Sequence, residues 1–204
     1  MTDRSLTKIM NRDTEAHGVD GKRRCAFCNM KNPLYVEYHD REWCVPNFDD
    51  GYLYEMLILE SFQAGLSWEC VLNKRASFKE AFEGFDPLRV KDFDCERIDR
   101  LMSNKGIIRN RRKIAAAIKN TKVFLKIAEE FGSFYNYLLG FTEGRTFYEV
   151  GKTKSELSDA LSGDLESRGM TFVGSVIIYS YLQAIGVIYS HERECFLFKE
   201  KSNK

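Results

Sequence analysis

The chain has 204 residues, of which 44% are hydrophobic, 30% are charged and only three are proline. This composition is typical of a folded globular protein and excludes a disordered or low-complexity chain. Thirty-one Lys and Arg offset thirty Asp and Glu to a net charge of +1, so the charge of the whole chain indicates neither a nucleic-acid nor a membrane partner.

The first 24 residues carry no apolar segment of the kind found in signal peptides and no helical periodicity. We therefore expect residues 1–24 to form a flexible leader, residues 25–204 to form a single domain, and the protein to be cytoplasmic.

Apolar spacing and capping residues predict a succession of helices after this leader. The first runs from Tyr52 to Ala64, begins after Asp49 or Asp50 and stops at Gly65. Further helices are predicted at Ser67–Asn73, Ser77–Phe82, Asp94–Met102, Arg109–Glu130 and Ser133–Leu139, then from Ser155 or Ser158 to Ser167, and finally at Val173–Ile188. No segment alternates as a strand does and no repeat is present, so the predicted fold class is all-α.

One uncharged stretch, Met170–Ser190, is long enough to cross a bilayer. Polar residues such as Tyr179, Ser180 and Gln183 interrupt it, which favours a buried core helix over a membrane span.

The segment from Arg100 to Ala128 carries nine Lys and Arg and no Asp or Glu. The rest of the chain holds 22 Lys and Arg against 30 Asp and Glu, so the balanced total conceals a local excess of positive charge. A solvated helix face is one explanation of such a run. A helix, a hairpin at Gly106 and a second helix, over about residues 94–126, would instead aim backbone N–H groups and Arg109 at a phosphate, as helix-hairpin-helix modules do.

Six cysteines, at positions 25, 28, 44, 70, 95 and 195, are expected to be reduced because nothing indicates secretion. Spacing alone assembles Cys25, Cys28, His191 and Cys195 into a structural Zn²⁺ site, with His39 as the competing fourth ligand. Buried thiols and a hydrogen-bonded histidine are the alternative. Four protein ligands would leave no position for water, so such a metal would clamp the ends of the folded region rather than catalyse hydrolysis.

Aromatic residues precede and follow the first predicted helix in the sequence. Tyr35 and Tyr38 are three residues apart, and Trp68 is one of only two tryptophans. Flat rings of this kind suit a base flipped out of a duplex. Glu60 lies on the same helix with apolar neighbours at helical spacing, so its carboxyl group is expected either in a partly apolar pocket or exposed at the helix end.

Several motifs together resemble 3-methyladenine DNA glycosylase I of the helix-hairpin-helix superfamily. The motifs are Arg24-Cys25, Asn32-Pro33-Leu34-Tyr35-Val36-Glu37-Tyr38-His39-Asp40-Arg41-Glu42-Trp43-Cys44-Val45-Pro46, Leu59-Glu60, Gln63-Ala64-Gly65-Leu66-Ser67-Trp68, Gly106-Ile107-Ile108-Arg109, Lys113-Ile114, Arg168-Gly169, Phe172-Val173-Gly174, Tyr179-Ser180, Gln183-Ala184, His191 and Cys195. The resemblance covers Cys25 to about Cys195. Two departures are Phe27, where the family often has tryptophan, and Cys44, where glycine is usual.

The resemblance implies a role for each of these groups. It implies one structural Zn²⁺ bound by Cys25, His39, His191 and Cys195, so that Cys28 is not a ligand. It implies a 3-methyladenine pocket formed by Glu60, Tyr35, Tyr38, Trp68 and Ser180, and DNA contacts from Lys105, Gly106, Arg109 and Leu66. The expected partner is double-stranded DNA that contains alkylated adenine, and the expected form is a monomer.

The chemistry of the lesion explains why few catalytic groups are expected. Methylation at N3 makes adenine positively charged, so the glycosidic bond is weakened and the base leaves neutral. No carboxylate lies between Asp99 and Glu129, where related enzymes place a catalytic Asp, so selection and electrostatics are assigned to Glu60, with Glu129 as a remote candidate base. No lysine needs to form a Schiff base, so no lyase step is expected. The alternatives are a non-catalytic, zinc-stabilised DNA-binding module and a glycosylase for another purine lesion.

Overall fold

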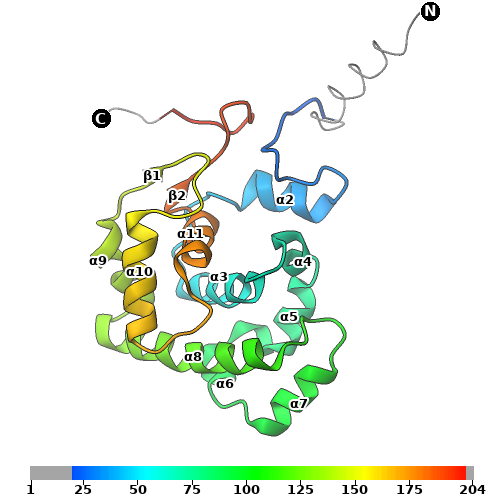
Figure 1. Cartoon of the computed structure of the whole chain (residues 1–204), viewed down its shortest axis with the longest axis vertical. Helices are drawn as coiled ribbons and strands as arrows, with labels where there is room; N and C mark the ends of the chain where they lie inside the picture. The colour runs from blue at the N-terminus through cyan, green and yellow to red at the C-terminus, as the bar shows by residue number, and fades with distance from the viewer. Residues whose placement is uncertain (1–19, 201–204) are drawn as a thin grey trace, which may run out of the picture.

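The described part of the chain, residues 20–200 of this computed structural model, is built almost entirely of helices (Figure 1). The helices are α2 (Pro33–Arg41), α3 (Asp50–Gln63), α4 (Trp68–Leu72), α5 (Arg75–Ala81), α6 (Pro87–Val90), α7 (Cys95–Ser103), α8 (Arg111–Phe131), α9 (Phe134–Thr142), α10 (Glu156–Ser167) and α11 (Ser175–Ala184), with a 3₁₀ turn, η1, at Glu83–Phe85. Two short strands, β1 (Phe147–Tyr148) and β2 (Ile188–Tyr189), pair in parallel. The prediction of a predominantly helical fold is therefore confirmed.

Capping residues start the helices where the sequence places them. Asp49, Ser67 and Asp94 each accept a hydrogen bond from the backbone N–H three residues further on, at the starts of α3, α4 and α7. At α10, Ser155 and Ser158 form a reciprocal capping box, so both of the predicted residues take part in the cap. Local hydrogen bonding thus fixes where these helices begin.

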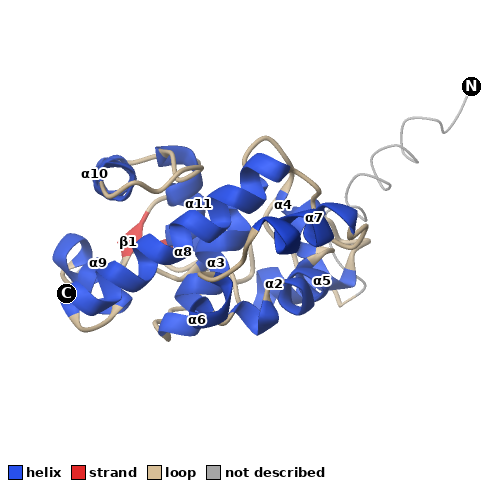
Figure 2. Ribbon diagram, turned by 90° about the horizontal axis from the view of Figure 1, so that it is seen from below, coloured by secondary structure: helices blue, strands red, loops and turns tan. Residues whose placement is uncertain are grey.

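Helix α3 lies at the centre of the fold, in contact with α11, α8 and α4 (Figures 1 and 2). Its sequence is apolar on nearly all sides, and a helix of that kind is stable only when it is covered all round. Nine of its residues are buried: Leu53, Tyr54, Met56, Leu57, Ile58, Leu59, Glu60, Ser61 and Phe62. Its central position brings Glu60 into the interior of the protein.

Two helices and a strand pair were not predicted. Helices α2 and α6 each begin with an Asn or Asp cap followed by proline, a recognised helix start, and both are short. The β1–β2 pair joins Phe147 to Ile188 and Tyr148 to Tyr189. Strands of two residues contain no alternation that a sequence could display, so the prediction of no strands is wrong at this pair.

The last predicted helix is shorter than expected. Helix α11 ends at Ala184, not at Ile188, and Gly186 follows with a φ of +76°. A Cβ atom on Gly186 would lie 2.3 Å from the backbone nitrogen of Pro46. The close approach of the two backbones requires glycine and ends the helix. Within residues 20–200, no helix is long and apolar enough to cross a membrane.

The start of the chain also differs from the expectation. Residues 1–19 of the expected leader lie outside the described residues, but Arg24 is only 8% exposed. Its guanidinium donates to Asp40 at 2.6 Å and to Asp20 at 2.8 Å. The chain is therefore already packed at residues 20–24, because these two carboxylates hold the buried cation in place.

Candidate functional site

A pocket of about 360 Å³ opens between α2, α3, α4, α11 and the segments that follow the two strands. The structure brings together all five residues predicted for the base pocket, which come from positions between 35 and 180 of the sequence. The lining residues are Phe27, Tyr35, Tyr38, Trp43, Glu60, Gln63, Trp68, Val150, Gly151, Lys152, Ser180, Gln183, Ser190 and Glu192.

Aromatic rings form the apolar walls of the pocket. The rings of Tyr38 and Trp68, from α2 and α4, lie 5.2 Å apart and are tilted by 45°. Phe27 stands edge-on to Trp43 at 4.6 Å, so the residue that replaces the usual tryptophan still contributes an aromatic ring. Rings fixed in this way can sandwich or cover a flat heterocycle.

The carboxyl group of Glu60 is buried in the pocket. The residue is 2% exposed, and Oε2 accepts no hydrogen bond from any described residue. Burial raises the pKa of Glu60 well above its usual range, because removal from water disfavours the charged form. An unpaired buried carboxyl group costs stability, and a cation or hydrogen-bond donor entering the pocket would remove that cost.

Two more polar atoms of the pocket lack partners among residues 20–200. They are Oε1 of Gln63, one helical turn after Glu60, and Nε1 of Trp68. The pocket therefore combines flat apolar walls with unsatisfied acceptors and a donor. This combination is suited to a planar ligand with polar edges. The walls that would cover such a ligand include Tyr35, Tyr38 and Trp68, all of them buried.

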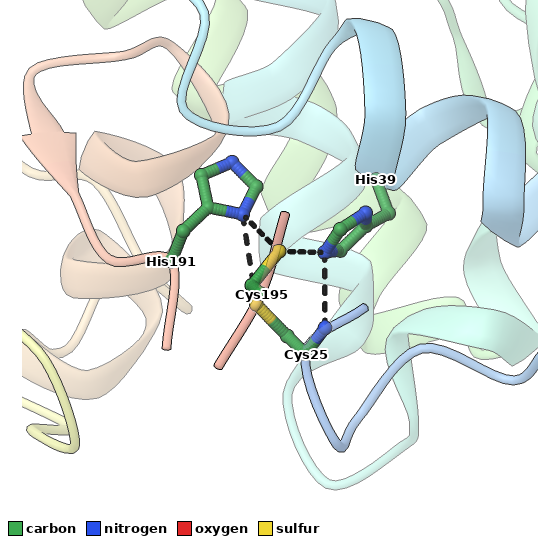
Figure 3. A group of neighbouring side chains, drawn as sticks. All are labelled: Cys25, His39, His191 and Cys195. Atoms are coloured by element: carbon green, nitrogen blue, oxygen red, sulfur yellow. Dashed lines mark hydrogen bonds between the residues drawn. The ribbon is translucent and has the colours of Figure 1, made fainter. Parts of the chain in front are cut away.

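Four buried side chains converge at a second centre beside the pocket (Figure 3). The ligand atoms of Cys25, His39, His191 and Cys195 all lie within 4.8 Å of one another. Nδ1 of His191 is 3.5 Å from both sulfur atoms, and Nε2 of His39 is 3.6 Å from Sγ of Cys195. A tetrahedral Zn²⁺ with ordinary bond lengths would place sulfur and nitrogen about 3.6 Å apart, so the cluster has the dimensions to hold a metal.

The surroundings of the cluster also suit a cation. His39 uses Nδ1 to bond Asp40 at 2.8 Å, which leaves Nε2 facing the two thiols. Burial lowers the pKa of His191 to about 4, so its imidazole is neutral, as a ligand must be. Cys28 does not join the cluster, because its thiol points to the backbone oxygen of Tyr35 at 3.8 Å.

The predicted hairpin connects α7 to α8. Asn104 accepts from the backbone N–H of Gly106 at 2.8 Å, and a Cβ atom at Gly106 would lie 2.9 Å from the side chain of Ser77. Glycine therefore lets the hairpin pack closely against α5. Lys105 and Arg109 are exposed on either side of it.

The positive segment is less uniform than the sequence suggests. Lys113 is only 7% exposed, and its ammonium group donates to the backbone oxygens of Phe62 and Ala64 at the end of α3. It binds the unpaired carbonyls of that helix and is not a surface charge. Arg111 pairs with Asp99. Lys113, one of the nine cations between Arg100 and Ala128, is therefore not part of a solvated helix face, because its long side chain reaches inward.

Other predicted residues occupy the expected surfaces. Ser180 lines the pocket from α11, and Leu66 is 42% exposed in the turn between α3 and α4. Glu129 is exposed near the end of α8 and is not among the lining residues, so it is not placed to activate water there. Sequence reasoning assigned no role to Gln63, although its spacing from Glu60 puts both on one helix face.

Solved structures of 3-methyladenine DNA glycosylase I have a similar fold. One crystal structure of 3-methyladenine DNA glycosylase I superimposes with a TM-score of 0.83 at 39% identity and covers 87% of this chain and 100% of its own. The enzyme from Staphylococcus aureus superimposes with a TM-score of 0.81 at 35% identity, over 85% of this chain and 95% of its own.

Sequence comparison gives the same family. The chain is 40% identical over 179 residues to DNA-3-methyladenine glycosylase 1 of Escherichia coli. The aligned region covers 84% of this chain and 95% of the relative. It is 36% identical to DNA-3-methyladenine glycosylase of Haemophilus influenzae, over 84% of this chain and 96% of the relative. The chain belongs to the methyladenine glycosylase family, whose sequence profile matches residues 27–198.

Proposed function

We propose that this protein releases 3-methyladenine from alkylated DNA by hydrolysis of the N-glycosidic bond. The observation that carries the proposal is the carboxyl group of Glu60, which has no hydrogen-bond partner among residues 20–200 and is buried in a pocket with aromatic walls. The relatives support it, because they are named as 3-methyladenine glycosylases and a variant of one was solved in complex with 3-methyladenine.

The pocket would select the lesion by its charge. Stacking between rings is worth about 1–3 kcal/mol per base but does not discriminate, since adenine has the same flat face. A 3-methyladenine nucleotide carries a positive charge that adenine lacks, and this charge favours the ionised form of Glu60 at the moment of binding. A cationic base thus offsets the cost of burying the Glu60 carboxylate more fully than neutral adenine, which offers only hydrogen-bond donors.

The reaction needs little acid catalysis. The glycosidic electron pair moves to the base and cancels its positive charge, water adds at C1′ of the sugar and then gives up a proton. Glu60, still ionised, would stabilise the positive charge that passes from the base toward the sugar in the transition state. No lysine adduct is part of this scheme, so we propose an enzyme without a lyase step.

We further propose that the segment from α7 to α8 works as a helix-hairpin-helix element on double-stranded DNA. The hairpin holds Gly106 close to α5, exposes Lys105 and Arg109, and leads into the start of α8, where backbone N–H groups can bind a phosphate. Leu66, exposed in the turn before α4, is available to occupy the space left by a flipped base. Since one chain supplies every wall of the pocket, we propose a monomer as the active form.

We propose Zn²⁺ as the metal of the Cys25, His39, His191 and Cys195 cluster. Two thiolates and two imidazoles at these separations are a typical zinc ligand set. The ion would stabilise the fold and supply no step of the reaction, because all four positions are taken by the protein.

The test is release of free base from methylated DNA. The wild-type protein should release 3-methyladenine, and Glu60→Gln should lower the single-turnover rate by at least tenfold while zinc content and folding persist. Glu129→Gln is the matched control, since it removes an exposed carboxylate outside the pocket and should leave the rate unchanged. A wild-type protein that binds methylated DNA but releases no base would instead support the non-catalytic DNA-binding module.

A further inference from the structure

The segment after β1 forms a wall of the pocket that no motif predicted. Val150, Gly151 and Lys152 all line it. The segment is held in place by the strand pair, because Glu149 donates its backbone N–H to Tyr189 at 3.0 Å and accepts at its backbone oxygen from the Ser190 hydroxyl at 2.6 Å. The backbone at the start of this segment is therefore anchored beside the pocket.

Lys152 is the single cation among the described residues that line the pocket. Its ammonium group lies 3.1 Å from the Glu149 carboxylate, and its side chain is 55% exposed. A side chain that lines a cavity and is also half exposed lies at the mouth, not at the base. The charge of Lys152 therefore stands where the cavity meets solvent.

A cation at this position does not suit the base itself. The lesion is positively charged, so Lys152 would repel it unless another group took up the charge. In the free protein the carboxylate of Glu149 compensates the charge of Lys152. When a nucleotide flips, its base enters the pocket while its sugar and the adjoining phosphates stay at the mouth. A lysine there meets a phosphate, for which its flexible stem and compact charge are suited.

We propose that Lys152, which pairs with Glu149 in the free protein, binds the backbone phosphate next to the flipped nucleotide. The inference rests on the proposed function and adds a residue that holds DNA only in its flipped state. The hairpin differs in this respect, because Lys105 and Arg109 meet phosphates of any duplex. Lys152 is thus a positioning residue that favours the committed complex over sliding on undamaged DNA.

The experiment compares Lys152→Ala with Lys154→Ala. Lys154 lies on the same segment, is exposed, forms no ion pair within residues 20–200 and does not line the pocket, so its substitution removes the same charge from the same region. Single-turnover release of 3-methyladenine from methylated duplex is measured against enzyme concentration and salt. Binding of undamaged duplex and of free 3-methyladenine is measured in parallel.

Lys152→Ala should raise the enzyme concentration for half-maximal release by about tenfold, the loss expected for one charge-assisted hydrogen bond. The slope of the logarithm of that concentration against the logarithm of the salt concentration should become shallower by the amount expected for about one phosphate contact. Binding of undamaged duplex and of free base should change less than twofold, Lys154→Ala should behave as wild type, and Lys152→Arg should restore most of the loss.

Three results would overturn the inference. One is that Lys152→Ala and Lys154→Ala need the same enzyme concentration for half-maximal release while the wild-type protein is active. Another is an equal loss on undamaged duplex, which would make Lys152 a general DNA contact. The third is a covalent adduct between Lys152 and the abasic sugar trapped by borohydride, which would make it a nucleophile. Absence of base release by the wild-type protein would refute the proposed function instead, so the two failures are distinguishable.

Discussion

The buried carboxyl group of Glu60 should give the free protein a pH-dependent stability that Glu60→Gln removes. In the unfolded chain a glutamate ionises with a pKa of about 4.3. Burial without a partner raises the pKa of Glu60 in the folded protein, so the folded state binds the proton more tightly than the unfolded state. The free energy of unfolding therefore falls as pH rises from the unfolded pKa to the folded pKa, and glutamine has no proton to lose.

The size of the effect follows from one proton. Between the two pKa values the slope approaches about 1.4 kcal/mol per pH unit. For a chain of this size that is a change in Tm of roughly 3 to 6 °C per pH unit. The Tm of Glu60→Gln relative to that of the wild-type protein should therefore rise steadily with pH, although the variant loses selectivity for the lesion.

The assay is thermal unfolding of the metal-loaded protein between pH 5 and pH 8, without DNA or base. The histidines also contribute to the pH dependence, because they take up protons in the unfolded chain, but this contribution is common to both proteins and cancels in the difference between the two curves. Glu129→Gln serves as the control, and its curve should run parallel to that of the wild-type protein. A Glu60→Gln curve that is also parallel would mean that Glu60 is already ionised in the folded state, and the proposed selection by charge would lose its basis.

Three further predictions concern other parts of the molecule. His39→Ala should lower zinc content and Tm, whereas Cys28→Ser should keep about one zinc per chain; equal retention measured by atomic absorption would contradict the ligand assignment. Reversal of the charges of Lys105 and Arg109 should weaken binding of every duplex alike and make its salt dependence shallower by about two contacts, and a loss confined to one sequence would argue against phosphate binding. Gly186→Ala should destabilise the protein by more than about 2 kcal/mol in urea titrations, since the added carbon meets backbone at 2.3 Å; an unchanged midpoint would show that the chain can yield there.

Much of the helical fold was predictable because its signals are local. A cap such as Asp49, Ser67 or Asp94 and the apolar spacing that follows it act over a few residues, and the structure uses each of them as predicted. The residues of the pocket could be named because their motifs resemble those of a known family. That they share one cavity is a property of the fold and needed the structure.

The parts that escaped prediction depend on contacts between distant segments. Lys113 lies in a run of surface cations, yet it is buried because the end of α3, about fifty residues earlier, presents carbonyls to it. Cys44 has a φ of +63°, which explains why glycine is usual at that position, but the angle becomes visible only in three dimensions. The wall formed by Val150 and Lys152 likewise depends on the β1–β2 pair.

The cluster of Cys25, His39, His191 and Cys195 can be completed only late in the synthesis of the protein. Cys25 and His191 are 166 residues apart, and Trp43, which lines the pocket, packs edge-on against His191 at 4.8 Å. During synthesis the chain emerges from its N-terminus, and the ligand set is incomplete until Cys195 has been made. Most of the helices can form earlier, but the pocket wall next to the cluster takes its final form with the last tenth of the chain. An unfinished polypeptide would thus contain the hairpin between α7 and α8 without a completed pocket.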